Sequence, residues 1–86
     1  MGFYIELEKI SETEVSVQYR FFNLTTDMEI SANNTGIIEL DKVTEEVIEI
    51  QHAPNDKNGL VFERAAKVLA KCWKENVYPE KTCWAS

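Results

Sequence analysis

Apolar and polar side chains alternate along the first part of the chain with the period of two that is typical of a β-strand with one buried face. The alternation is clearest in residues 3–10 and 14–22, and a polar turn separates the two segments. These segments therefore predict a β-hairpin. On its polar face, Glu6 and Glu8 are expected to lie near Arg20, the only cation among the facing positions.

Three shorter segments with strand character follow, at residues 27–32, 37–41 and 47–51. The last two predict a second hairpin, and the turn between them contains no glycine. If that turn requires a positive φ, Glu45 or a neighbour adopts it at a cost of about 1 kcal/mol relative to glycine. Loops of three and of four residues both fit the pattern, and they give different cross-strand partners.

The pattern changes to helical spacing after Pro54. Apolar residues recur every three or four positions from Leu60 onward, which predicts an amphipathic helix over about 59–76. Pro79 prevents the helix from continuing. The candidates for its N-terminal cap are three polar residues that precede it, Asn55, Asp56 and Asn58.

A sheet with one apolar face needs a cover, and this helix is the only segment that supplies one. The predicted fold class is therefore α+β, an antiparallel four- to five-stranded meander covered on one face by a single C-terminal amphipathic helix. With 86 residues the chain is too short for two independent cores, so residues 1–86 are expected to form a single domain.

The tail, residues 77–86, carries the aromatic side chains of Tyr78 and Trp84 close to its end. One interpretation is that both fold back and complete a small core. The other is that Trp84 anchors a partner protein or a second protomer. The sequence leaves both open.

The charges are divided along the chain, which has a net charge of −6. Residues 1–56 contain 12 acidic and 3 basic residues, whereas residues 57–86 contain 3 acidic and 6 basic residues. Such asymmetry bears on the choice of partners rather than on the fold. Lys67, Lys71 and Lys74 form a basic arc on the helix, but the net negative charge argues against nucleic acid as a partner.

The composition, 44% hydrophobic and 28% charged, is that of a globular protein. No apolar run approaches the roughly 20 residues that span a bilayer, and Glu6, Glu8 and Lys9 interrupt the region where a signal peptide needs an apolar core. We therefore expect a cytoplasmic protein that does not enter a membrane. Cys72 and Cys83 are expected to be reduced there.

The residues that carry chemistry do not form a catalytic pattern. Glu6 and Glu8 share a strand face, but alternating glutamates are typical of the solvated face of a half-buried strand. His52 is the only histidine, and the spacing of Cys72 and Cys83 matches no zinc motif. No glycine-rich phosphate loop is present. The sequence therefore predicts a protein that is not an enzyme and that holds no metal or cofactor.

The first functional hypothesis is an acidic protein-binding module, in the manner of an inhibitor or immunity protein for a basic partner. Its size, acidity and architecture are similar to those of such proteins, without a shared motif. Clustered carboxylates accelerate encounters with cationic surfaces and select them. The candidate contacts are Trp84 and eight acidic residues: Glu6, Glu8, Glu29, Glu39, Asp41, Glu45, Glu46 and Glu49.

Two other hypotheses are open. The second is a structural or assembly subunit, most simply a homodimer. Such a dimer would pair edge strands or the faces that carry Tyr4, Phe22 and Ile37. The sequence leaves open whether the chain is a monomer or a homodimer. The third hypothesis is an enzyme or small-ligand protein that uses His52 and Cys72, and such a protein requires a pocket.

Overall fold

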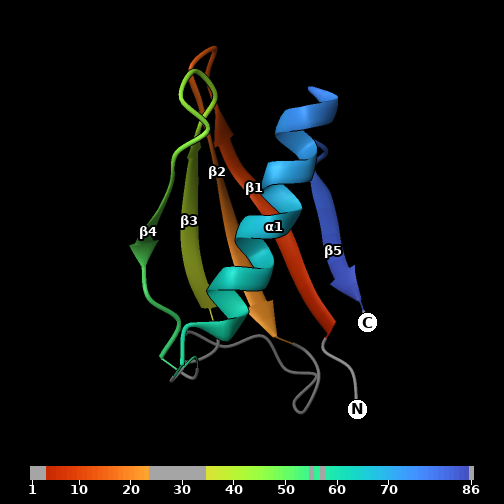
Figure 1. Cartoon of the computed structure of the whole chain (residues 1–86). Coiled ribbons are helices and arrows are strands. Elements are labelled where there is room, and N and C mark those ends of the chain that lie inside the picture. Colours follow the sequence, from red (N-terminus) through yellow and green to blue (C-terminus); the bar gives the residue numbers. More distant parts are fainter. Residues whose placement is uncertain (1–3, 24–34, 55, 57, 86) are drawn as a thin grey trace.

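The protein is a five-stranded antiparallel sheet with one helix packed on one face, as Figure 1 shows for the computed structural model. The structure describes residues 4–23, 35–54, 56 and 58–85. The elements are β1 (Tyr4–Glu12), β2 (Ser16–Asn23), β3 (Thr35–Asp41), β4 (Val47–Gln51), α1 (Leu60–Glu75) and β5 (Lys81–Ala85). The predicted α+β class and the single covering helix are confirmed.

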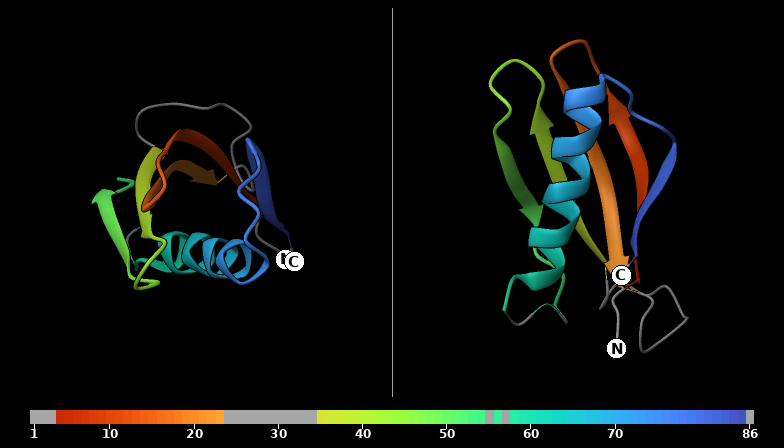
Figure 2. Two further views of the ribbon diagram at one scale, coloured as in Figure 1. Left: turned by 90° about the horizontal axis from the view of Figure 1, so that it is seen from above. Right: turned by 45° about the vertical axis from the view of Figure 1, so that its right-hand side comes forward.

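The strand order is β4-β3-β2-β1-β5. The first four strands follow one another as neighbours, and α1 then leads the chain across the sheet to the far side of β1. There β5 pairs antiparallel with β1, with Trp84 opposite Ile5. Seen from above, the sheet curves around the helix (Figure 2). The tail is therefore a strand, whereas the strand predicted at 27–32 lies outside the described residues.

The first hairpin has the predicted facing residues, but β1 ends two residues later and β2 begins two residues later than predicted. Its register places Glu8 opposite Arg20, and it shifts between Lys9 and Ser11. The shift marks a β-bulge, and Ile10 beside it is exposed. After the bulge, β1 continues to Glu12, beyond the predicted end of the strand.

The second hairpin has a four-residue loop, residues 42–45. The amide of Asp41 donates to the carbonyl of Glu46, and the amide of Glu45 donates to the carbonyl of Asp41, both at 2.8 Å. Glu45 adopts a φ of 65°, so the expected positive φ falls on Glu45 itself. The carboxylate of Asp41 stabilises the turn by accepting from the amide of Val43 at 2.8 Å.

The core lies between the sheet and α1. Side chains of Ile5, Leu7, Tyr19, Phe21, Ile38 and Leu40 are fully buried there against the apolar stripe of the helix. Gly36 lies opposite Phe21 in the sheet. A Cβ at this position would overlap the Phe21 ring and approach the Gln51 carbonyl oxygen to 2.9 Å, so the aromatic packing requires glycine here.

The N-terminus of α1 is capped from a distance by Asp56. Its two carboxylate oxygens accept from the amides of Val61 at 3.0 Å and Phe62 at 2.9 Å, and the residue is only 3% exposed. Of the three residues predicted as candidates for the N-terminal cap, Asp56 is therefore the one that caps the helix. Asn58 is exposed, and Asn55 lies outside the described residues. The negative carboxylate also complements the positive end of the helix dipole.

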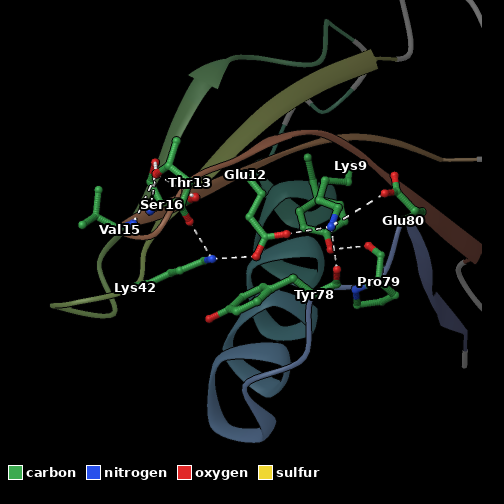
Figure 3. Close-up of polar contacts among 10 residues, drawn as sticks. Lys9, Glu12, Thr13, Val15, Ser16, Lys42, Tyr78, Pro79 and Glu80 are labelled. Atoms are coloured by element: carbon green, nitrogen blue, oxygen red, sulfur yellow. Dashed lines mark hydrogen bonds and ion pairs between the residues drawn. The ribbon is translucent and has the colours of Figure 1, made fainter.

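A polar cluster at the turn end of the sheet holds the segment between α1 and β5 (Figure 3). The ammonium group of Lys9 donates to Glu12 at 2.7 Å and to the carbonyl of Tyr78 at 2.8 Å. Lys42 donates to the other oxygen of Glu12 at 2.6 Å and lies 4.6 Å from the centre of the Tyr78 ring. The hydroxyl of Tyr19 donates to the carbonyl of Pro79. These contacts align the chain for its pairing as β5.

Candidate protein-binding site

The face of the sheet opposite α1, called the outer face below, carries four of the predicted acidic contacts on the strands β1 and β3. Because side chains alternate along a strand, the neighbours of the buried core residues point away from the helix. These neighbours are Glu6 and Glu8 on β1 and Glu39 and Asp41 on β3. These four carboxylates therefore lie on the face that the helix leaves uncovered.

The negative charge of Glu8 is balanced by two nearby cations. Arg20, its cross-strand neighbour, donates a hydrogen bond to its carboxylate, as the sequence predicts. Lys81 on β5 adds an ion pair at 3.8 Å, which sequence reasoning missed because the tail had not been assigned to a strand. The hydrogen bond from Arg20 lowers the pKa of Glu8 below its ordinary value. Less of its charge is available to a partner.

Glu39 and Asp41 also have partners within the chain. The amide nitrogen of Gln18 donates to Glu39 at 2.8 Å across β2 and β3. Asp41 is occupied by the turn that it stabilises. By contrast, the side chains of Glu6, Glu45 and Glu46 form no hydrogen bond or ion pair within the described part of the chain. Glu29, also predicted as a contact, lies outside that part.

The structure separates Glu49 from the other predicted contacts. Glu49 lies opposite Ile38, a core residue, so its side chain projects to the helix side of the sheet. One of its oxygens is 3.4 Å from Nδ1 of His52, and the other is buried without a hydrogen-bond partner among the described residues. Only the register of β3 and β4, which the sequence left open, determines this orientation.

The outer face of β4 carries apolar side chains that sequence reasoning did not single out. Ile48 and Ile50 are 43% and 49% exposed. Ile48 shares a face with Glu46 and lies opposite Glu39 on β3, and Ile50 is the extra residue of a β-bulge, where the register between β3 and β4 shifts. β4 is also an edge of the sheet, with β3 on one side and no described strand on the other. We call Glu39, Glu46, Ile48 and Ile50 the β4 surface.

The aromatic tail folds back. Tyr78 and Trp84 are half-buried and pack against the core, as the first interpretation of the tail expected. The guanidinium of Arg64 lies over the Trp84 ring, 5.4 Å from its centre. Trp84 therefore has contacts within the chain, and only part of it is open to a partner.

Phe22 is not an exposed anchor for a second protomer, contrary to the sequence-based hypothesis. It is 1% exposed, although it does not belong to the cluster beneath the helix. Ile37 is half-buried, and the side chain of Tyr4 lies outside the described part of the structure. Of the three residues proposed for a dimer face, Phe22 is therefore unavailable.

The candidate catalytic residues do not converge. Cys72 lies in the core, where burial raises the pKa of its thiol, and Cys83 is exposed on β5. His52 contacts Glu49 rather than either thiol. No group of three or more histidine, cysteine or acidic residues is arranged to hold a metal ion within the described ranges.

No helix in the part of the chain that the structure describes is both long and apolar enough to cross a membrane. Comparison with protein-family models, with curated proteins and with solved structures found no significant match.

Proposed function

We propose that this protein is a non-catalytic binding module for a basic protein, of the inhibitor or immunity type, and that the β4 surface contacts the partner. The observation that carries this proposal is the pair of exposed isoleucines on β4, an edge strand among the described residues, with Glu46 on the same face as Ile48 and Glu39 opposite Ile48. Apolar side chains at the centre of an interface supply affinity, and a charged rim supplies selectivity.

The surroundings of the β4 surface extend it toward the size of a protein interface. A standard interface buries about 800 Å² on each partner, more than two isoleucines provide. The adjoining turn adds Val43, which is 72% exposed, and the unpaired carboxylate of Glu45. A partner with lysine or arginine around an apolar patch matches this arrangement. We expect the encounter to take place in the cytoplasm, where Cys72 and Cys83 would remain reduced thiols.

The test is affinity capture from the native host at low and high salt, with the wild-type chain and three double variants. I48S/I50S removes the apolar centre, and E39Q/E46Q removes two carboxylates of the β4 surface. The control E63Q/E75Q makes the same change of charge on α1. We expect a basic protein to be captured by the wild type and by the control, and to be lost with I48S/I50S.

Two results would count against the proposal. One is that no basic protein is captured at low salt. The other is that capture is unchanged by I48S/I50S or equally reduced by E39Q/E46Q and E63Q/E75Q, because the signal would then reflect overall charge rather than this surface.

A homodimer that pairs two β4 edges is the alternative, and the unpaired edge favours it. Such pairing would place two copies of the acidic segment Glu46 to Glu49 side by side, and like charges on neighbouring strands are destabilising. Light scattering at tens of micromolar distinguishes the two, since a monomer at this concentration excludes a stable dimer.

A further inference from the structure

The opposite edge of the sheet borders a groove. β5 has β1 on one side and no described strand on the other, so its outward amides and carbonyls are not used by the sheet. A groove of about 320 Å³ lies between β5 and α1, with Val68 and Lys71 on the helix side and Thr82 and Trp84 on the strand side. The ribbon views place β5 alongside the helix (Figures 1 and 2).

The helix side of this groove is positively charged, in contrast to the rest of the molecule. Lys67 and Lys71 line it, with Glu75 as the one acidic residue. Lys71 has no ion pair in the described chain. The ammonium group of Lys67 lies 4.0 Å from the carboxylate of Glu63, which is a long distance for an ion pair, and both side chains are more than half exposed. A pair so exposed contributes little, so both ammonium groups are available to an anionic ligand.

The groove also has apolar walls. Val68 and Cys72 are buried residues of the helix that reach it, and Val77 and Pro79 border it at one end. Trp84 contributes its ring, and its indole N–H is buried without an acceptor among the described residues. A ligand that fits must therefore combine apolar and anionic groups.

We propose that this α1–β5 groove binds an extended acidic peptide segment of another protein, which adds a strand to β5. A helix beside an open edge strand is an arrangement suited to β-strand addition, where backbone hydrogen bonds supply affinity and alternate side chains supply specificity. On the face of the segment that points to the helix, acidic side chains pair with Lys67 and Lys71, and apolar side chains contact Val68 and Trp84. This site is independent of the β4 surface, because it lies at the other edge and has the opposite charge.

The probe is a fluorescein-labelled heptapeptide with valine and glutamate at its odd positions and serine at its even positions, so that valine and glutamate share one face of the strand. Its binding is measured by fluorescence anisotropy at low salt. Two matched peptides serve as controls: one has glutamine in place of glutamate, and the other carries N-methyl groups on alternate peptide nitrogens. The protein variants are K71Q and K74Q. They remove equal charge from α1 three residues apart, but only Lys71 lines the groove.

We expect the acidic peptide to bind, K71Q to weaken binding at least fivefold, and K74Q to change it less than twofold. The glutamine and N-methylated peptides should each bind at least fivefold more weakly. Amide exchange measured by NMR should slow in β5 on binding, while β4 is unaffected. Lack of binding, equal effects of K71Q and K74Q, or undiminished binding of the N-methylated peptide would overturn the proposal. None of these results depends on the β4 surface.

Discussion

Glu12 at the end of β1 accepts a hydrogen bond of 2.6 Å from the ammonium group of Lys42, which lies in the turn between β3 and β4. The same carboxylate binds Lys9, whose ammonium group also holds the carbonyl of Tyr78. One carboxylate thus connects the two hairpins to the segment that leads into β5 (Figure 3).

Replacing Glu12 by glutamine should lower the free energy of unfolding by about 0.5–1 kcal/mol, the upper range for partly exposed ion pairs. The ammonium groups of Lys9 and Lys42 would lose their common counter-charge. Urea denaturation measures the change. Glu6→Gln is the matched control on the same strand, because Glu6 has no ion pair in the described chain. Equal stability of the two variants would contradict a stabilising role for the cluster.

The same contacts predict a pH dependence. The hydrogen bond from Lys42, followed by that from Lys9, holds the pKa of Glu12 below its ordinary value of 4.5. On acidification the carboxylate of Glu12 is therefore protonated at a higher pH in the unfolded chain than in the folded protein. The stabilisation is complete above about pH 4.5 and is lost as the pH falls through the lower pKa of the folded state.

Thermal denaturation between about pH 3 and pH 7 checks this dependence. Below pH 4.5 the melting temperature of the wild type should fall more steeply than that of Glu12→Gln, so that the difference between them narrows. Glu6→Gln should follow the wild-type curve. A constant difference across the acid range would show that the Glu12 charge does not contribute.

Replacing Glu45 by glycine should stabilise the protein. Glu45 has a φ of 65°, where a residue with a Cβ is about 1 kcal/mol less favourable than glycine. The greater freedom of glycine in the unfolded chain offsets part of this gain. We expect a net increase of about 0.5 kcal/mol in the free energy of unfolding. Glu46→Gly, at a neighbouring position without positive φ, should be destabilising, and the opposite ranking would be inconsistent with the turn geometry.

Replacing Asp56 by alanine should destabilise the protein by about 1–2 kcal/mol, the upper range for loss of an N-terminal cap. The amides of Val61 and Phe62 would lose their acceptors at the start of α1. Circular dichroism during urea denaturation follows the helix directly. Asn58→Ala is the control, since Asn58 is exposed and makes no described capping bond. If the two substitutions lowered the free energy of unfolding equally, Asp56 would not be the residue that caps the helix.

Several features of the fold were predictable from sequence because they depend on neighbouring residues. The alternation around Ile5 and Leu7 and the helical spacing from Leu60 placed those elements within about two residues. Because its turn contains no glycine, any positive φ there had to fall on Glu45 or a neighbour, and the structure places it on Glu45. The continuation of β1 beyond Ile10 was not predictable, because a bulge breaks the alternation there.

The candidate binding sites were less predictable, because a surface combines residues from separate strands. The acidic composition indicated a cationic partner, but it did not show that Arg20 and Lys81 neutralise Glu8 while Glu46 stays unpaired. The exposure of Ile48 and Ile50 depended on the register of β4, which a loop longer or shorter by one residue would have changed.

The amino-acid sequence by itself determined the α+β class, the amphipathic helix and the acidic character of the sheet, because periodicity and charge are local properties. Only the tertiary structure decided that the tail forms β5, since that strand exists through pairing with β1 at the other end of the chain. That pairing also creates the groove beside Lys71 and brings Arg64 over Trp84. The physical reason is that edge pairing depends on how the folded sheet and helix meet, and no short stretch of sequence contains that information.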